Sequence, residues 1–398
     1  MSLNETVSAE RVHIAFFGRR NAGKSSLVNA VTGQSLAVVS DVFGTTTDPV
    51  KKAMELLPIG PVMIIDTPGF DDEGELGEKR VAKTREILAK TDIAVLVIDA
   101  NIGKSMWEED FLEIIKEKNI PLITVYNKSD LCKKEDLREN EISVSAESKE
   151  GISALKEMLG ALAKTRQNER KIVGDLIERG DTVVLVTPID ESAPKGRLIL
   201  PQQQTIRDIL DHGAISVVCQ VEELQTVLSS LAKPPKMVIT DSQAFGKVSK
   251  IVPSDIPLTS FSILFARYKG NLESQVQGAA ALKDLCDGDK ILIAEGCTHH
   301  RQCGDIGTVK IPKWISDFSG AKIEFDFTSG GEFPTDLSKY KMVVHCGGCM
   351  LNEAEMTSRV KSVKSAGLPI VNYGVAIAHI NGILSRSLEL FPDVLKLL

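Results

Sequence analysis

One short segment near the N-terminus constrains the fold more than any other feature of the chain. It reads GRRNAGKS, from Gly18 to Ser25, and it lies between the apolar run VHIAFF and the helical pattern SSLVNAVTG. A strand, a glycine-containing loop and a helix in this order form a phosphate-binding P-loop. Backbone N–H groups of such a loop and the helix N-terminus bind phosphate oxygens. The segment therefore predicts a parallel α/β domain that binds a nucleotide.

Apolar runs of strand length alternate with amphipathic stretches along the rest of the chain. The runs include IAVLVID, PLITVYN, TVVLVTP, ISVVCQ, KMVIT, KILIAEG, KIEFDF, MVVHC and PIVNY, and the amphipathic stretches include 151–163, 222–231, 271–286 and 352–366. Strands that alternate with helices predict an α/β protein with mainly parallel sheets.

Composition excludes several classes of protein. The hydrophobic content of 43% and the charged content of 25% are typical of soluble globular chains. A net charge of −7 argues against a nucleic-acid-binding surface, and no apolar run reaches the ~18 residues that span a bilayer. We therefore expect a cytoplasmic protein that binds neither nucleic acid nor a membrane. In that compartment the seven cysteines are expected to be reduced, so clustered ones indicate metal or redox chemistry.

Three motifs supply groups for phosphates and Mg²⁺. In the P-loop, Lys24 is expected to reach the β- and γ-phosphates, and Ser25 to bind Mg²⁺. The motif DTPG, from Asp66 to Gly69, ends an apolar strand and supplies a carboxylate that holds Mg²⁺ through water. The polar loop GTTTD places Thr46 for the metal and the γ-phosphate.

Two later motifs predict that the nucleotide carries guanine. In NKSD, the carboxylate of Asp130 can accept from the N1 and N2 groups of guanine, and the stem of Lys128 can lie against the base. The motif SAE, from Ser145 to Glu147, can offer a backbone N–H to the guanine carbonyl oxygen. All five motifs in the correct order indicate GTP and GDP rather than ATP. The residues predicted to contact the nucleotide are Gly18, Asn21, Ala22, Gly23, Lys24, Ser25, Ser26, Thr46, Asp66, Asn127, Lys128, Asp130, Ser145 and Ala146, and the catalytic ones are Lys24, Thr46, Asp66 and Gly69.

Residues 10–165 resemble the Era and MnmE type of small GTPase. Phe70 follows DTPG at the position where Ras-like enzymes place a glutamine that orients water, and a phenyl ring cannot position water. Asn21 resembles the asparagine with which MnmE-type proteins bind an activating K⁺. The resemblance therefore implies slow intrinsic GTP hydrolysis that K⁺ stimulates.

Two stretches suggest where the domains divide. The polar run 163–171 follows the last nucleotide motif, and the stretch 252–260 contains two prolines and is interpreted as a linker or loop. We predict a P-loop GTPase domain at 1–168, a middle α/β domain at 169–264 and a third α/β domain at 265–398.

Cysteines and histidines gather at the ends of two apolar runs in the third domain. Cys297 follows KILIAEG with His299 two residues later, and MVVHCGGC contains His345, Cys346 and Cys349. Ligands of open α/β sheets bind at the carboxyl ends of the strands. Two adjacent parallel strands would therefore bring Cys297 close to the pair Cys346 and Cys349, and a metal site is predicted there.

The residues alone leave the identity of the metal open. Zinc would take the three thiols and either His299 or His345. An iron–sulfur cluster takes four ligands that are usually cysteines, and this site offers three. Local chemistry favours zinc slightly, and a set of buried cysteines without metal is the third alternative. Cys303 and Asp305 are further candidates for the fourth position.

The complete chain resembles the FeFe-hydrogenase maturation GTPases known as HydF. The resemblance rests on Cys297-x-His299, the 45 residues that follow, and His345-Cys346-x-x-Cys349, placed after an MnmE-like GTPase domain and a middle α/β domain. It implies a 4Fe-4S cluster on the three cysteines and a homodimer formed through the middle domain. The fourth iron would keep an exchangeable position, filled by one of the histidines, Cys303, Asp305 or a small molecule.

The same resemblance implies the partners. Such proteins act as a scaffold or carrier for the di-iron subcluster precursor of the hydrogenase active site. They work with the radical-SAM maturases HydE and HydG and deliver to the apo-hydrogenase. Two other functions are alternatives to this one: a zinc-stabilised Era-like regulatory GTPase that acts on RNA or ribosomes, and a redox enzyme that uses the cluster for electron transfer. The acidic charge and the lack of a basic tail weigh against the first of these, and the lack of a second cofactor motif weighs against the second.

Overall fold

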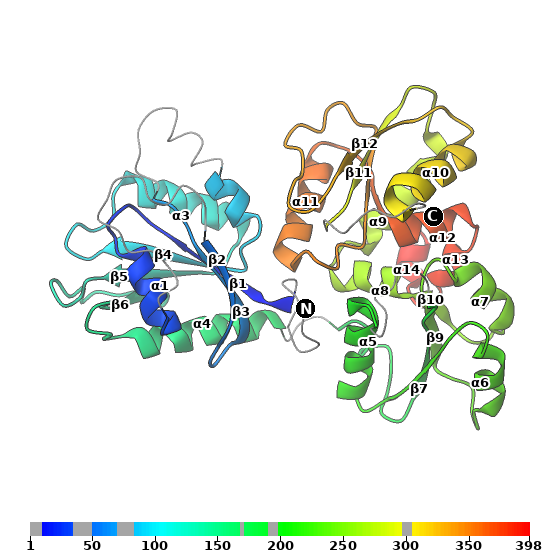
Figure 1. Cartoon of the computed structure of the whole chain (residues 1–398), viewed down its shortest axis with the longest axis horizontal. Coiled ribbons are helices and arrows are strands. Elements are labelled where there is room, and N and C mark those ends of the chain that lie inside the picture. The colour runs from blue at the N-terminus through cyan, green and yellow to red at the C-terminus, as the bar shows by residue number, and fades with distance from the viewer. Residues whose placement is uncertain (1–9, 35–49, 70–82, 168–170, 190–197, 297–304) are drawn as a thin grey trace. The chain divides into compact units, whose positions relative to one another are not determined.

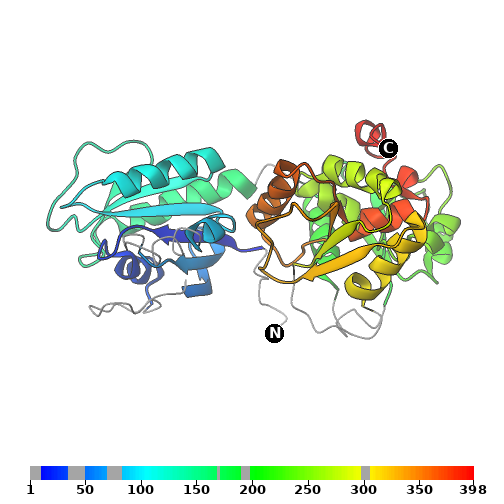
Figure 2. The same cartoon turned by 90° about the horizontal axis from the view of Figure 1, so that it is seen from above.

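The computed structural model describes residues 10–34, 50–69, 83–167, 171–189, 198–296 and 305–398 (Figure 1). The chain forms two units, one of Met1–Glu169 with Asn352–Glu355 and one of Arg170–Leu351 with Met356–Leu398. In each unit, helices pack against sheet structure whose strands are mainly parallel (Figure 2).

The first unit contains a six-stranded sheet in the order β2-β3-β1-β4-β5-β6. Its strands are β1 (Val12–Phe17), β2 (Val50–Leu56), β3 (Gly60–Asp66), β4 (Ile93–Asp99), β5 (Leu122–Asn127) and β6 (Glu141–Ser143), and its helices include α1 (Lys24–Thr32), α3 (Met106–Lys118) and α4 (Ile152–Gln167). Among the described strands of this sheet only β2 and β3 pair in the antiparallel direction.

Helices cover both faces of this sheet because successive side chains of a strand point to opposite faces. Ile14 and Phe16 of β1 pack in one buried cluster with side chains of α1 and α4. Ala15 and Phe17 pack in a second cluster with Phe111 of α3. A strand that is buried on both faces explains the continuous apolar run VHIAFF.

The second unit contains two four-stranded sheets, and every strand pair described in them is parallel. Their orders are β10-β9-β7-β8 and β12-β11-β13-β14. The strands are β7 (Thr182–Val186), β8 (Ile215–Cys219), β9 (Met237–Thr240), β10 (Leu258–Ser260), β11 (Lys290–Ala294), β12 (Glu324–Thr328), β13 (Met342–His345) and β14 (Ile370–Asn372). The helices are α5 (Leu200–Asp211), α6 (Leu224–Ser230), α7 (Phe245–Ile251), α8 (Phe261–Tyr268), α9 (Leu272–Ala280), η2 (Ala281–Asp284), η3 (Ile306–Lys310), α10 (Ile311–Ser319), α11 (Glu353–Ser365), α12 (Tyr373–Ile380), α13 (Leu384–Ser387) and α14 (Pro392–Leu395).

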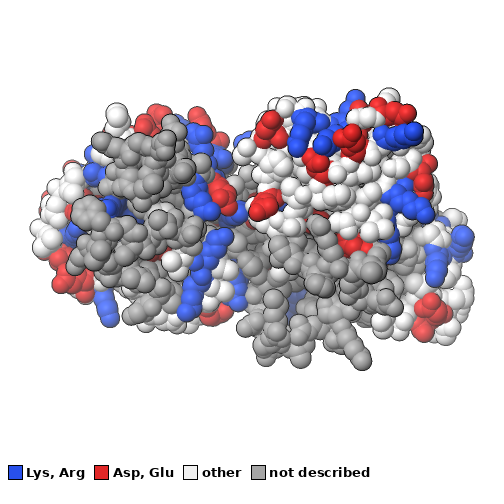
Figure 3. All heavy atoms as spheres, turned by 45° about the horizontal axis from the view of Figure 1, so that its top comes forward, with Lys and Arg blue, Asp and Glu red and all other residues white. Residues whose placement is uncertain are grey.

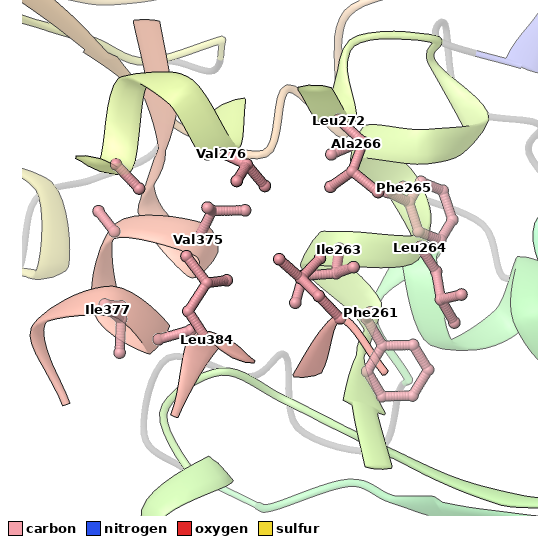
Figure 4. Close-up of a cluster of buried hydrophobic side chains, with 14 of the residues drawn as sticks. Phe261, Ile263, Leu264, Phe265, Ala266, Leu272, Val276, Val375, Ile377 and Leu384 are labelled. Atoms are coloured by element: carbon pink, nitrogen blue, oxygen red, sulfur yellow. The ribbon is translucent and has the colours of Figure 1, made fainter. Parts of the chain in front are cut away.

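The two sheets of the second unit share one hydrophobic core. Val183 and Leu185 of β7 belong to the same buried cluster as Ile291 and Ile293 of β11. Side chains from α8, α9 and α12 belong to this cluster, and Figure 4 shows Val276 of α9 facing Val375 of α12. Burial of one such side chain, for example Phe261, stabilises the fold by about 1.5–3 kcal/mol. The two sheets are therefore parts of a single packed body.

The predicted α/β class with mainly parallel sheets is confirmed, and each predicted apolar run contains a strand. The interpretation of 252–260 as a linker or loop is wrong for its last part, because Leu258–Ser260 forms strand β10 and pairs with β9. A strand of three residues is too short to show a pattern beside two prolines. Strands β2 and β6 were also not predicted.

Lys and Arg side chains are interleaved with Asp and Glu side chains over the described part of the face shown in Figure 3. Among the described helices, none combines the length and the apolar character that crossing a bilayer requires.

Candidate nucleotide and metal sites

The P-loop joins β1 to α1, and two of its glycines are required by their surroundings. Gly18 has a φ of +148°, and a Cβ atom there would lie 2.2 Å from the carbonyl oxygen of Val97. Gly23 has a φ of +85°, and a Cβ atom there would lie 2.2 Å from Nδ2 of Asn127. Any side chain at either position would therefore displace the loop.

Lys24 is buried at the start of α1, with 7% of its surface exposed. Its Nζ donates hydrogen bonds to the carbonyl oxygens of Gly18 at 2.9 Å and Arg19 at 2.7 Å. The ammonium group therefore lies within the loop that is predicted to hold the phosphates.

Ser25 and Asp66 form the polar group predicted to hold Mg²⁺. The hydroxyl of Ser25 donates to Oδ2 of Asp66 at 2.7 Å. The other carboxylate oxygen, Oδ1, is buried and has no hydrogen-bond partner among the described residues. Burial raises the pKa of Asp66, although Ser25 and Lys24 act in the opposite direction. A hard cation takes oxygen ligands of this kind and would compensate the buried charge, so the pair fits Mg²⁺.

Asn127 connects two loops of the nucleotide site. Its Nδ2 donates to the carbonyl oxygen of Ala22 in the P-loop at 3.0 Å, and its Oδ1 accepts from the backbone N–H of Ala146 at 3.1 Å. The side chain is almost fully buried, so both bonds are protected from water. In this structure the N–H of Ala146 is therefore bound to Asn127, and its predicted contact with guanine stays a prediction.

The remaining predicted nucleotide residues can be placed along the same edge of the sheet. Ser26 lies in the first turn of α1, Gly69 follows β3, Lys128 and Asp130 follow β5, and Ser145 follows β6. Thr46 and Phe70 lie outside the described residues. Asp130 is exposed, as a group that reads a base must be before the nucleotide binds. Asn21 is also exposed and has a φ of +58°.

Sequence reasoning missed the residues that anchor the P-loop from outside. Nε of Arg19 donates to Oε1 of Glu108 at 2.7 Å, and its guanidinium also donates to the carbonyl oxygen of Gly103 at 3.0 Å. Glu108 is buried near the start of α3, where its carboxylate also accepts from the N–H and hydroxyl of Ser105. The motif SxxE is a capping-box signal in the sequence, but nothing in it indicates a contact with Arg19.

The second site lies at the carboxyl ends of β11 and β13. These strands pair in parallel with Ala294 opposite His345, and the N–H of Cys346 donates to the carbonyl oxygen of Ala294 at 2.9 Å. The segment that carries Cys297 directly continues β11, so the adjacency expected for the two strands is present. Cys297 itself lies outside the described residues, as do His299 and Cys303.

The sulfur of Cys346 accepts two backbone hydrogen bonds. The N–H of Gly296 lies 3.0 Å from Sγ and that of Gly348 lies 3.3 Å from it. Burial raises the pKa of Cys346, and these N–H groups act in the opposite direction. Burial also raises the pKa of Cys349, and there the charge of Lys269 opposes it. Thiolates that receive N–H bonds are suited to a thiophilic metal or cluster, so the two described thiols fit one.

Within the described ranges, no group of three metal-ligating side chains comes together. The predicted set of Cys297, Cys346 and Cys349 includes a position outside those ranges, so the ligand set stays a prediction. Asp305 accepts from the N–H and hydroxyl of Thr308, each at 2.9 Å, and caps η3.

A lysine outside the predicted site holds the loop between the two cysteines. Lys269 follows α8, and its Nζ donates to the carbonyl oxygens of Gly347 at 3.1 Å and Gly348 at 2.6 Å. Gly348 has a φ of +60°, a conformation that L side chains rarely adopt. The lysine therefore fixes the Cys-x-x-Cys loop and brings a positive charge close to both thiols.

His345 is fully buried, and both of its ring nitrogens are occupied. Nδ1 lies 2.7 Å from the carbonyl oxygen of Cys346, and Nε2 lies 3.1 Å from a guanidinium nitrogen of Arg359. A carbonyl only accepts and a guanidinium only donates, so the ring is neutral with its proton on Nδ1. Burial, assisted by Arg359, lowers the pKa of His345 to about 3. In this structure His345 supports the thiol loop and offers no free nitrogen to a metal.

Comparisons with known proteins match three successive segments of the chain. The family described as 50S ribosome-binding GTPase matches residues 13–128. The Hydrogen maturase F dimerization domain matches 172–270, and the Hydrogen maturase F tetramerization domain matches 273–390. These two domains together cover more than half of the chain.

Two curated relatives each match less than half of the chain. The tRNA modification GTPase MnmE of Endomicrobium trichonymphae is 37% identical over 152 residues, which are 35% of this chain and 32% of that protein. The GTPase Der of Clostridium acetobutylicum is 30% identical over 171 residues, which are 42% of this chain and 39% of that protein. The chain thus spans about a third of the length of these relatives.

Proposed function

Because the chain belongs to the hydrogen maturase F family, we propose that it is a GTP-hydrolysing scaffold or carrier in the maturation of an FeFe-hydrogenase. The observation that carries this proposal is the order of the matched segments, a GTPase domain at 13–128 followed by the two maturase domains at 172–270 and 273–390. In this role the protein would bind a 4Fe-4S cluster, receive a di-iron precursor with the help of HydE and HydG, and deliver it to the apo-hydrogenase. The domain division at 168/169 and at 264/265 stays a prediction.

We propose that the first unit binds and hydrolyses GTP through the residues described above. Bound Mg²⁺ would neutralise charge on the phosphates, held by Ser25, Thr46 and, through water, Asp66. Lys24 exchanges its two carbonyl partners for phosphate oxygens when the nucleotide enters, because a charged acceptor binds an ammonium more strongly. The exposed carboxylate of Asp130 accepts hydrogen bonds from the N1 and N2 groups of guanine.

The hydrolysis rate is proposed to be low without K⁺. Phe70 cannot orient water, and the oxygen of Asn21 is a suitable ligand for K⁺. The positive φ of Asn21 is consistent with a residue whose backbone is fixed for a ligand, because asparagine tolerates this conformation better than most side chains.

We propose that Cys297, Cys346 and Cys349 hold the cluster. Two contacts support this proposal: the pair of N–H bonds to the sulfur of Cys346 and the ammonium of Lys269 on the loop beside it. An anionic cluster is stabilised by such donors. His345 acts as a positioning residue because its nitrogens bind Cys346 and Arg359. The fourth position then belongs to an exchangeable ligand, for which His299, Cys303 and Asp305 remain candidates.

We propose that the protein forms a homodimer through the sheet that contains β8. This strand lies at the edge of its sheet, and Ile215 and Val218 on it are 52% and 44% exposed. An edge strand with exposed apolar side chains pairs readily with another chain. The match of residues 172–270 to a dimerization domain supports dimerization through this part of the chain.

One alternative function is favoured by a specific observation. The family matched by residues 13–128 is described as ribosome-binding, so a zinc-stabilised GTPase that acts on RNA or ribosomes is the second candidate. The interleaved charges on the described face in Figure 3 and the two maturase domains make it the weaker one.

Anaerobic purification of the full chain separates the two candidates. Iron and sulfide in the purified protein, a 4Fe-4S EPR signal after reduction and activation of apo-hydrogenase in the presence of HydE and HydG are expected. A colourless protein that contains zinc, that fails to activate the hydrogenase and that sediments with ribosomes would favour the second candidate.

A further inference from the structure

The turn that follows β4 is not part of any nucleotide motif identified in the sequence. It runs from Asp99 to Gly103, and the carbonyl oxygen of Asp99 accepts from the N–H groups of Ile102 at 3.1 Å and Gly103 at 2.9 Å. The N–H of Ala100 donates to the carbonyl oxygen of Asn127 at 2.9 Å. The turn is therefore closed on itself and bound to the end of β5, where the guanine motif begins.

Three donors occupy the carboxylate of Asp99. Nζ of Lys128 lies 2.7 Å from Oδ2, while the backbone N–H and the side-chain amide of Asn101 lie 3.0 and 3.1 Å from Oδ1. Partial burial acts to raise the pKa of Asp99, but the bonds from Lys128 and Asn101 outweigh it and lower the pKa. Asp99 is therefore charged at neutral pH and holds the ammonium of Lys128 at a fixed point.

Lys128 needs such an anchor. Its φ is +67°, a left-handed conformation that a lysine rarely adopts. Backbone outliers of this kind persist where the surrounding contacts fix them, and they occur often at ligand sites. The four-carbon stem of a free lysine is mobile, whereas a stem fixed at both ends presents one apolar surface in a constant place.

The other end of the turn touches the P-loop. The guanidinium of Arg19 donates to the carbonyl oxygen of Gly103 at 3.0 Å and is held in place by Glu108. The turn from Asp99 to Gly103 thus contacts both the residue predicted to cover the base and the loop predicted to bind the phosphates.

We infer that Asp99 is a positioning residue for guanine-nucleotide binding, because it fixes Lys128 in the place where its stem covers the base. Asp99 does not touch the nucleotide and acts only through Lys128. This inference rests on the nucleotide site proposed above and adds a residue that none of the matched motifs contains. Because Arg19 also binds this turn, the residues predicted to contact the base and the loop predicted to bind the phosphates are both attached to the segment from Asp99 to Gly103.

The test measures the dissociation constant for GDP with the full-length protein in the presence of Mg²⁺. We expect Asp99→Asn, which keeps the shape of the side chain and loses its charge, to weaken GDP binding by about threefold to tenfold. Asn101→Ala removes one donor to Asp99 and should cause a smaller loss in the same direction. Thermal unfolding of each variant shows that it is folded.

A double-mutant cycle distinguishes positioning from a general structural role. In a Lys128→Ala background, Asp99→Asn should change the dissociation constant by less than about twofold, because the side chain through which it acts is already lost. Glu141→Gln provides the matched control, since it breaks a 2.9 Å ion pair with Lys104, the residue that follows the turn. This control should bind GDP like the wild type.

Two results would overturn the inference. Equal losses from Asp99→Asn in both backgrounds, or an equal loss from Glu141→Gln, would show that Asp99 only stabilises the turn. Unchanged binding in Lys128→Ala would remove the nucleotide role of Lys128 and the inference with it. A failure of the nucleotide site is thereby distinguished from a failure of Asp99 alone.

Discussion

Arg359 donates a hydrogen bond to Nε2 of His345 at 3.1 Å, and both side chains are buried. The opposite nitrogen, Nδ1, donates to the carbonyl oxygen of Cys346. A histidine with both ring nitrogens engaged would support the proposed metal site without being a ligand, and this distinction can be tested.

Substitutions that preserve one bond at a time probe His345. His345→Asn places an amide donor near the position of Nδ1, and His345→Gln places an acceptor near the position of Nε2. Each is expected to retain iron, with a reduction of at most about tenfold in cluster affinity and an altered EPR spectrum. Cys346→Ala, measured in parallel, should lose most of the iron. If either histidine variant lost iron as completely as Cys346→Ala, the histidine would be a ligand of a closed site.

Lys269 provides a test of charge at the thiol loop. Lys269→Met removes the ammonium that binds Gly347 and Gly348, so the more negative reduced state of a cluster becomes less favourable. The reduction potential of the reconstituted protein should become more negative, on the order of tens of millivolts. Lys269→Arg keeps the charge and should shift the potential less. Equal potentials in all three proteins would mean that Lys269 acts on the loop shape alone.

Asp130 is predicted to determine which base the nucleotide site accepts. Asp130→Asn replaces the acceptor for the N1 and N2 donors of guanine with an amide, so GTP binding should fall and xanthosine triphosphate binding should rise. Loss of a site built for such bonds changes discrimination on the order of 10⁴-fold. Competition between the two nucleotides measures it, and an unaltered preference for GTP would contradict the role of Asp130.

Lys24 tests whether the two sites are independent. Lys24→Ala should reduce GTP hydrolysis by at least about 100-fold, because the phosphates lose their main cation. The iron content should remain near that of the wild type, since the thiols belong to the other unit. Iron and sulfide analysis beside the GTPase assay checks both. A loss of iron in this variant would show that the cluster depends on the P-loop.

The carboxylate of Asp326 should make the free energy of unfolding depend on pH. Its carboxylate accepts from Lys339 at 2.9 Å and from the hydroxyl of Tyr340 at 3.0 Å, and these bonds lower its pKa to about 2. The contribution of Asp326 to the free energy of unfolding is therefore fully present above the ordinary pKa of 3.8. It is lost as the pH falls through about 2. Asp326→Asn should lower the urea midpoint at pH 7, and the difference should vanish near pH 2. A constant difference over that range would exclude the charge as its cause.

Much of the fold could be predicted from the sequence because buried parallel strands are continuous apolar runs. The antiparallel strand β2, VKKAMEL, is mostly exposed and has no such run, so nothing indicated it. The strand β10 has three residues and follows two prolines. Both depend on neighbours in the sheet rather than on their own sequence pattern.

The site residues that belong to sequence motifs could be predicted, whereas those that act through tertiary contacts could not. Motifs at the ends of β1, β3 and β5 identified Lys24, Asp66 and Asn127 because their spacing follows the strand edges. Asp99, Lys269 and Arg359 belong to no motif, and their partners lie 14 to 79 positions away in the chain. Such residues become visible only when the fold brings them together.

The single core that the two sheets of the second unit share makes them one cooperative folding element. Phe261 and Ile263 of α8 and Val375 of α12 belong to it together with strands from both sheets (Figure 4). A fragment that ended near residue 264 would expose this apolar surface to water, and a fragment that began there would expose its other half. Amide hydrogens in β7 and β11 should therefore exchange in the same global opening event. The loop between Cys346 and Cys349, which Lys269 binds, is attached to this element and should open only with it.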